Sequence, residues 1–343
     1  MRQGILFLIG LSIFAVGCEE QKKSDDTKFF VEETPKIVDS IQLVEAALVD
    51  APEDLNLLLT LGRLCKEKFY YNCALDAGAK AFRIDSTNLE ARALYAWTLI
   101  NKPEPPLIDV ERAKRHYKYI LSITPNDPQM IVQLANTYSF LGDYETSFKF
   151  INDALRIDDK VRDAYVLKGS NYRIMGNYEL ALSSYQTAVQ IDPAYFMGQL
   201  QIGYLLTNLE RHKLAIEYYQ NAAELDPTSV EAWYGVAKSH QDIGDFDEAQ
   251  HYYRKILSID PKFYIAYFNQ GFIKQYEVME LDSATYYYNL CLDVQPEAVR
   301  AWHHLGMTYL SQNRKSDAAR AFSEALTLNP DFQPTIEAKE VLR

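Results

Sequence analysis

Apolar side chains recur along this chain at helical spacing, in pairs of short segments. From Val299 onward, apolar or small residues fall at i, i+3, i+4 and i+7, which is one face of a helix: Trp302, Leu305, Gly306 and Tyr309. Asn313 and Arg314 interrupt this face. A second helical face follows at Ala318, Phe322 and Ala325, and Pro330 ends it. The pattern predicts a pair of helices joined by a short turn.

The same unit returns every 34 or 35 residues. Its first helix carries a small residue at Gly169, Gly203, Ala237, Gly271 and Gly306. Its second helix carries one at Ala181, Ala215, Ala249, Ala284 and Ala318, and a proline follows at Pro193, Pro227, Pro261, Pro296 and Pro330. Such periodicity indicates a solenoid, whose units bury their apolar faces against their neighbours. We expect the small residues where two helices cross, because they allow the backbones to approach.

This unit resembles the tetratricopeptide repeat. The family's pattern of an aromatic residue, Leu-Gly, Tyr, Ala, Phe and Pro is met by Trp302, Leu305, Gly306, Tyr309, Ala318, Phe322 and Pro330. The frame covers residues 55–332 as eight units. Its eighth position is small throughout: Gly62, Ala96, Ala135, Gly169, Gly203, Ala237, Gly271 and Gly306. So is its twentieth: Ala74, Ala113, Ser147, Ala181, Ala215, Ala249, Ala284 and Ala318. The resemblance implies an all-α, right-handed superhelical solenoid of about eight repeats.

Three units depart from this frame. The second has five extra residues in or near the run Lys102 to Pro106, where we expect a protruding loop because proline interrupts helices. The seventh, from Tyr264, has one extra residue, which we place near 278–282. The first has Gly78 where a large aromatic residue usually lies.

The two ends of the array predict capping helices, which a solenoid needs for solubility. Residues 35–54 form a half-repeat in which Thr34 is the expected N-cap. Its apolar stripe consists of Ile37, Ile41, Val44 and Leu48. Residues 333–343 form the expected C-terminal capping helix.

The first residues have the plan of a bacterial lipoprotein signal peptide. Arg2 provides a positive start, and an uncharged stretch too short to span a bilayer leads to Ala15-Val16-Gly17-Cys18. These four residues are similar to a lipobox, which implies cleavage after residue 17 and lipidation of Cys18. Residues 18–34 then form a polar tether. The alternative is an ordinary secretory signal with an incidental cysteine. We expect a protein that is anchored by lipid in the bacterial cell envelope, at the outer membrane. It would lie on the periplasmic face or on the surface face of that membrane.

Composition and motifs argue against several classes of function. The formal net charge of −12, without clustered Lys and Arg, disfavours a nucleic-acid partner. The six histidines form no metal-binding motif, and His303 and His304 diverge by about 100° on a helix. No nucleophile or phosphate-binding motif is present in the sequence, so we predict a protein that is not an enzyme and has no cofactor or metal.

Cys65 and Cys73 lie in one predicted helix pair of an exported protein. An oxidising compartment permits a disulfide between them. The alternative, which we favour from the sequence, is that both are small apolar core residues. Cys291 takes the place that alanine occupies in other units and is expected in the core.

The family resemblance implies a concave groove lined by the second, fifth, ninth and twelfth positions of each first helix. From the fifth unit on, aromatic residues collect at or near these positions: Tyr204, Tyr234, Phe268, Phe272 and Tyr276, with Lys238 and His303. The sharper interpretation is a peptide-binding groove with aromatic anchors. The alternative is lateral packing of one helix against the next.

These observations predict a non-catalytic interaction scaffold that binds a protein or peptide segment in its groove. The Lys and Asn pattern of chaperone-binding members is not met, because Asn136 is present but Val132 occupies the matching Lys position. The leading alternative is a dedicated assembly factor of an envelope machine, such as a pilus, a secretion pore or the outer-membrane protein assembly complex.

Overall fold

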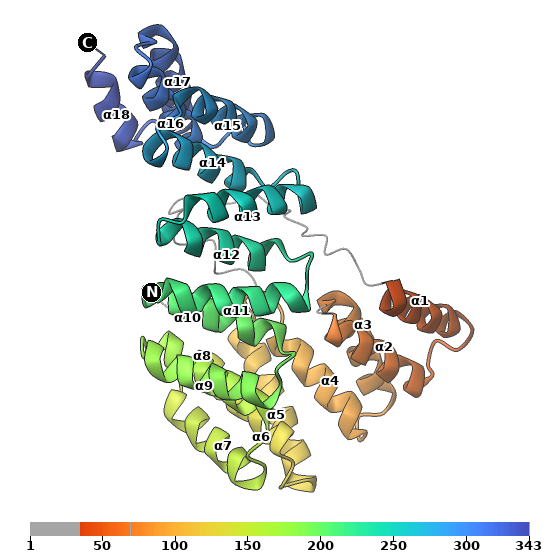
Figure 1. The fold of residues 1–343 in the computed structure, drawn as a ribbon. Helices are drawn as coiled ribbons and strands as arrows, with labels where there is room; N and C mark the ends of the chain where they lie inside the picture. Colours follow the sequence, from red (N-terminus) through yellow and green to blue (C-terminus); the bar gives the residue numbers. More distant parts are fainter. Residues whose placement is uncertain (1–34, 69, 343) are drawn as a thin grey trace. The chain divides into compact units, whose positions relative to one another are not determined.

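The computed structural model describes residues 35–68 and 70–342 (Figure 1). This part of the chain forms eighteen α-helices and one π-helix and contains no strand. No helix within it is long and apolar enough to cross a membrane. The chain divides into two compact units, Met1–Gly198 (unit 1) and Gln199–Arg343 (unit 2). The predicted signal peptide, Cys18 and tether lie outside the described residues.

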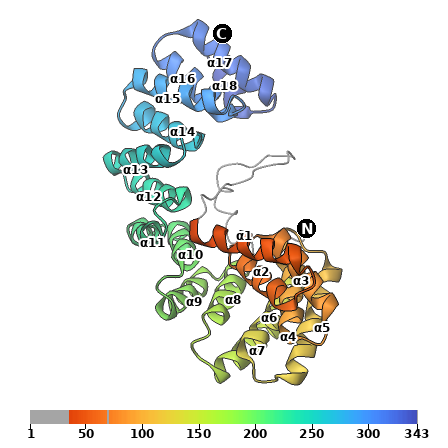
Figure 2. The same cartoon turned by 90° about the vertical axis from the view of Figure 1, so that its right-hand side faces the viewer.

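Unit 1 is built from helices that pack in consecutive pairs (Figure 2). They are α1 (Pro35–Asp50), α2 (Leu55–Glu67), α3 (Tyr71–Ile84), α4 (Leu89–Ile100), α5 (Leu107–Ile123), α6 (Pro128–Phe140), α7 (Tyr144–Ile157), α8 (Arg162–Ile174) and α9 (Tyr178–Ile191). The pairs are α2 with α3, α4 with α5, α6 with α7, and α8 with α9. The N-terminal helix α1 packs on α2, where Ile41 is buried and Val44 and Leu48 join the same apolar cluster. Ile41, Val44 and Leu48 therefore act as the expected capping stripe.

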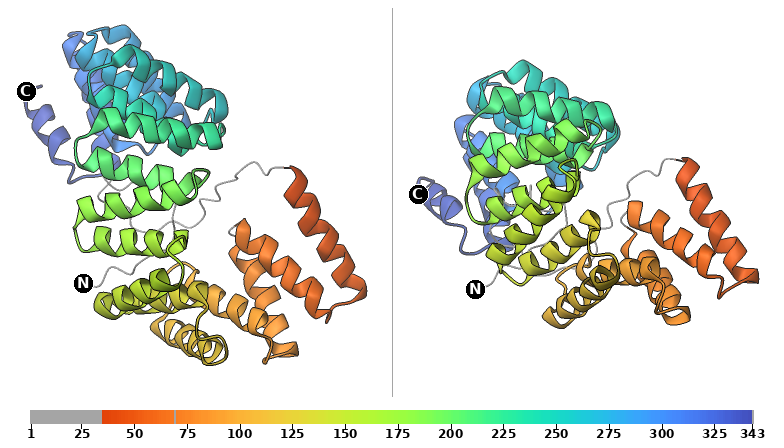
Figure 3. Two further views of the ribbon diagram at one scale, coloured as in Figure 1. Left: turned by 60° about the horizontal axis from the view of Figure 1, so that its bottom comes forward. Right: turned by 90° about the horizontal axis from the view of Figure 1, so that it is seen from below.

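Unit 2 continues the same plan. Helix α10 (Phe196–Asn208) spans the boundary, and the helices after it are α11 (His212–Leu225), α12 (Val230–Asp242), α13 (Phe246–Ile259), α14 (Tyr264–Phe272), η2 (Ile273–Glu277), α15 (Leu281–Val294), α16 (Val299–Ser311), α17 (Lys315–Leu328) and α18 (Gln333–Glu340). Helix α18 packs on α17 and α16. It is the last helix of the chain, beside the C-terminus in Figure 3. The fold class is therefore the predicted one: all-α, made of adjacent helix pairs, with a capping helix at each end.

Small residues lie at the helix crossings, as the periodicity predicts. The residue at the twentieth position of the repeat is fully buried in all eight pairs: Ala74, Ala113, Ser147, Ala181, Ala215, Ala249, Ala284 and Ala318. At the eighth position, the glycines leave room for a ring from the second helix. A Cβ atom added to Gly306 would lie 2.5 Å from the Phe322 ring, and one added to Gly271 would lie 2.8 Å from that of Tyr288. A larger side chain at either glycine would force the helices apart.

The turn between the two helices of a pair uses left-handed backbone at one fixed place. In six successive pairs this residue has φ between 58° and 81°: Gly142, Gly176, Glu210, Gly244, Met279 and Asn313. Glycine adopts this backbone without steric cost because it has no Cβ atom. For L-residues the left-handed conformation costs roughly 1–2 kcal/mol of free energy. Glu210 and Met279 are therefore strained turn residues.

Both predicted insertions are present, one of them in a different place. Residues 101–106 contain no helix, which confirms the loop expected at the proline run. The sequence predicted the extra residue of the seventh pair near 278–282, but the structure places it earlier. It is accommodated by the π-helix η2, because widening one helical turn takes up a residue without breaking the helix.

Cys65 and Cys73 form a disulfide, so the expectation of two unlinked core residues was wrong. They lie on either side of the turn between α2 and α3, with Cα atoms 5.9 Å apart, within the range that a disulfide bridges. Cys291 is a free, fully buried cysteine of α15, as expected.

Candidate functional site

All seven residues predicted to line a groove lie in unit 2, on or directly after the first helix of a pair. Tyr204 is on α10, Tyr234 and Lys238 are on α12, Phe268 and Phe272 are on α14, Tyr276 is in η2 and His303 is on α16. Tyr276 is 39% exposed, and the other six are half-buried. These positions allow contact with a partner and with neighbouring helices at the same time.

Three of the predicted residues meet around a histidine that was not predicted. The rings of Phe268, Phe272 and Tyr276 have their centroids 5.4, 5.7 and 5.7 Å from that of His304. The Tyr288 ring stacks on the same imidazole at 5.9 Å. Tyr276 Oη and His304 Nδ1 are 3.2 Å apart, a hydrogen bond in which either group can donate. We call these five residues the His304 cluster.

The π-helix η2 positions part of this cluster. It continues α14 directly, so that Gln275 lies in the interior while Tyr276 lies at the surface. The Tyr288 hydroxyl donates to Gln275 Oε1 over 2.8 Å, and this buried bond fixes η2 to α15. π-Helical turns are rare and are frequently found at functional sites. Here the widened turn brings Tyr276 to His304.

The imidazole of His304 is neutral at physiological pH. Burial, together with the smaller effects of the neighbouring His303 and Arg300, lowers its pKa to about 3. A neutral imidazole offers one donor and one acceptor, and its aromatic face packs with apolar groups. Arg300 lies with its guanidinium carbon 5.2 Å from the Phe268 ring centroid, a cation–π contact at the edge of the cluster.

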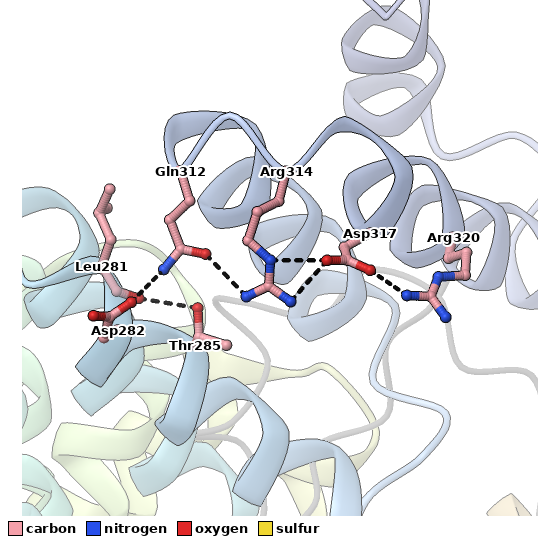
Figure 4. A network of polar contacts seen from close by, with 7 residues as sticks. All are labelled: Leu281, Asp282, Thr285, Gln312, Arg314, Asp317 and Arg320. Carbon is pink, nitrogen blue, oxygen red and sulfur yellow. Dashed lines mark hydrogen bonds and ion pairs between the residues drawn. The ribbon is translucent and has the colours of Figure 1, made fainter.

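Helix α16 is fixed beside α15 by a chain of polar contacts at their ends (Figure 4). Gln312 Nε2 donates to Asp282 Oδ1 over 2.8 Å, and Arg314 Nη1 donates to Gln312 Oε1 over 3.4 Å. Arg314 Nε donates to Asp317 Oδ2 over 2.8 Å, and Arg320 pairs with the other oxygen of that carboxylate. Hydrogen bonds from Arg320 and Arg314 hold the pKa of Asp317 below its usual value. The network supports the two helices that carry Tyr288 and His304.

Of the other predicted residues, His303 contacts the His304 cluster, since its ring centroid lies 5.1 Å from that of His304. His303 Nδ1 lies 3.0 Å from Thr335 Oγ1, and its ring packs against Phe322 and Phe332, so it contacts the capping helix α18. The Tyr234 ring packs against Phe263 at 5.7 Å. Lys238 is paired with Asp242 on its own helix. The predicted set therefore separates into three residues of the His304 cluster, His303 between this cluster and α18, and a group of Tyr204, Tyr234 and Lys238 on α10 and α12.

Two residues of interest were missing from the predicted set. His304 lies at the sixth position of its repeat, outside the positions that the family pattern assigns to the groove. Glu231 lies at the second position of α12, which is a groove position, but it is acidic, whereas the predicted set consists mostly of aromatic residues. Within the described residues no group of three or more His, Cys, Asp or Glu side chains is arranged to hold a metal ion.

Comparison with known sequences identifies the repeats. Tetratricopeptide-repeat profiles match residues 128–161, 163–195, 206–269 and 299–332. These four segments are therefore tetratricopeptide repeats, a class that generally provides scaffolds for protein interactions. No curated protein matches the chain in sequence.

Solved structures share the fold at low sequence identity. The C-terminal part of a TPR repeat-containing protein from Cytophaga hutchinsonii is 20% identical, with a TM-score of 0.59, over 67% of this chain and 94% of that one. The human IFIT1 dimer with PPP-AAAA is 18% identical, with a TM-score of 0.53, over 87% and 80%. The APC/C hetero-tetramer Cut9-Hcn1 is 16% identical, with a TM-score of 0.52, over 90% and 59%. At this level of identity the likeness shows the fold alone.

Proposed function

We propose that this protein is a non-catalytic scaffold that binds a peptide or protein segment through the first helices of unit 2, with the His304 cluster as the main anchor site. Tetratricopeptide repeats are in general interaction scaffolds, which supports the class of function. The repeats are ordered before a partner arrives, so association does not carry the cost of folding a binding surface.

The single observation that carries this proposal is the surface of the seventh pair. Tyr276 is 39% exposed beside the cluster, and the two apolar residues that follow closely, Val278 and Met279, are 39% and 72% exposed. Aromatic side chains in partly closed surroundings supply most of the binding energy at protein interfaces. An apolar surface of this kind beside a π-helix is typical of an interaction site.

The test uses peptides selected from a random short-peptide library on the full chain. The affinity of the selected peptides is then measured for Phe272→Ala and Tyr276→Ala. We expect each variant to bind about 30-fold more weakly, which corresponds to the roughly 2 kcal/mol of a hot-spot residue. Tyr286→Ala is the matched control, because Tyr286 is a 60% exposed tyrosine on the second helix of the same pair.

Thermal unfolding distinguishes binding from packing. Tyr276→Ala should unfold close to the wild-type temperature, whereas Tyr253→Ala should not, because Tyr253 is fully buried. If Phe272→Ala and Tyr276→Ala bind the selected peptides as well as Tyr286→Ala does, the anchor assignment is wrong.

We also propose that the scaffold is anchored in the bacterial cell envelope by a lipid on Cys18. The support is the sequence around Cys18: an uncharged segment of signal-peptide length that ends in a lipobox-like tetrad. Lipid labelling of wild type and Cys18→Ser tests this proposal. We expect the label to be lost and the precursor to remain uncleaved in the variant. A processed, membrane-associated Cys18→Ser protein would contradict it.

A further inference from the structure

Glu231 is a partly buried carboxylate, and among the described residues no Lys, Arg or His pairs with it. It lies in the first turn of α12, and its side chain is half-buried. Within the described residues its Oε1 atom is inaccessible to solvent and accepts no hydrogen bond. Burial raises the pKa of Glu231 to about 7, with no cationic side chain opposing the shift. A buried acceptor without a donor is unfavourable, so its presence calls for an explanation.

The Tyr219 ring packs against this part of α12. A Cβ atom on Gly203 would lie 2.8 Å from the Tyr219 ring, and one on Gly235 would lie 2.4 Å from it, so this ring fills the space between α10 and α12. Tyr204 and Tyr234 are the sequence neighbours of these two glycines. Glu231 precedes Gly235 by four residues and therefore shares its helix face. Glu231 is thus placed beside the Tyr219 ring.

The electrostatics of Tyr219 agree with this placement. Burial raises the pKa of the Tyr219 phenol, and a hydrogen bond with Thr207 acts in the opposite direction. Glu231, Tyr204 and Tyr234 each add to the rise. These three residues all lie at groove positions of the first helices α10 and α12, and Tyr234 follows Glu231 by three residues, which places both on one face of α12.

We propose that Glu231, together with Tyr204 and Tyr234, forms a subsite for a lysine or arginine side chain of the bound peptide. The inference rests on the proposed function, because it assigns one feature of the peptide that the scaffold binds. A carboxylate without a counter-ion attracts a cation, and the faces of tyrosine rings favour one as well. An acidic side chain would be repelled, and an apolar one would leave the carboxylate oxygen without a donor.

The experiment compares peptides selected from one random library on the full chain and on its Glu231→Gln variant. The glutamine keeps the size of the side chain and removes its charge. Glu248→Gln is the matched control, because Glu248 is an exposed acidic residue in the first turn of α13. We expect lysine and arginine to be enriched at one position of the peptides selected on wild type and on Glu248→Gln, and this enrichment to be absent on Glu231→Gln.

A second measurement uses one lysine-containing peptide and its norleucine analogue. The analogue should bind wild type about tenfold more weakly, and the difference should fall below about twofold on Glu231→Gln. If Glu231→Gln does not fold, Glu231→Ala replaces it in both measurements. Selected peptides without this enrichment, or with equal enrichment on Glu231→Gln, overturn the subsite and leave peptide binding intact. A library from which no peptide is selected overturns both proposals.

Discussion

The first helix pair and the stretch from α12 to α15 both depart from the regular repeat, but only the first pair is compensated. In the first pair, Gly78 replaces the usual aromatic ring, and Leu94 of the next pair fills the space beside Gly62 and Gly78. The Cys65–Cys73 disulfide ties the two helices together. The irregularity is thus covered by an apolar side chain and a covalent bond.

The irregularities between α12 and α15 have no such compensation. Gln270 is completely buried, yet neither its Oε1 nor its Nε2 has a hydrogen-bond partner within the described residues. The same repeat position holds buried Ile202, Val236 and Leu305 in the other pairs of unit 2. Met279 is strained and exposed, and Glu231 lacks a counter-ion. Departures that reduce stability without repair are expected at functional sites, which is where we place the peptide.

The largest expected effect is on the compensated pair. Cys65→Ala/Cys73→Ala opens a loop of eight residues, and the chain-entropy model gives a loss of about 2–3 kcal/mol in the free energy of unfolding. Hydrogen exchange should locate this loss in α1 to α3, because repeats contact only their neighbours. Reductant should reproduce the effect in wild type and leave the double variant unchanged. Equal loss of protection in α14 and α15 would contradict a local role.

Gln270→Leu is expected to stabilise the protein by about 2 kcal/mol, because it removes two unsatisfied polar atoms from the core and keeps the volume. Urea unfolding measures the change. Leu305→Gln, at the same position of the next pair, is the reciprocal control and should lower the free energy of unfolding. Destabilisation by Gln270→Leu would mean that the Gln270 amide makes a stabilising contact. The stretch from α12 to α15 would then differ less from the compensated first pair.

Glu231→Gln should give a pH-dependent gain in stability. The folded-state pKa of about 7 lies above the reference value of 4.5, so the folded protein binds more protons than the unfolded chain between these values. The wild type therefore loses stability as the pH rises from about 4.5 through 7. The variant should match wild type at low pH and exceed it near pH 8. An offset that does not vary with pH would show that burial of the charge is not the cause.

The smallest effect concerns the turn. Met279→Gly relieves a left-handed backbone, and we expect a gain of about 0.5–1 kcal/mol after the entropy cost of glycine. Asn313→Gly at the equivalent turn should gain less, because asparagine tolerates this backbone. Differential scanning calorimetry of both variants gives the comparison, and a loss of stability in Met279→Gly would show that the Met279 side chain packs usefully.

The repeat and its small residues could be read from the sequence because their spacing is local and recurs eight times. The disulfide could not, since pairing depends on where the α2–α3 turn places Cys65 and Cys73. The position of the extra residue was missed because a π-helix has no distinct local pattern. His304 was missed because its contacts come from three separate helices. The closeness of Phe268, Phe272 and Tyr276 follows from the family groove positions at or beside which they lie, whereas Tyr204 and Tyr234 at similar positions lie on other helices.

The disulfide also has a mechanical consequence. A protein pulled from its N-terminal end would transmit force through the covalent link from Cys65 to Cys73, and the residues between them would carry none. Eight residues extended at about 3.5 Å each span about 28 Å, whereas the bridged Cα atoms are 5.9 Å apart, so unravelling of the first pair would release about 22 Å less chain than in the reduced protein. Under oxidising conditions the first repeat therefore yields a shorter extension before the load reaches α4.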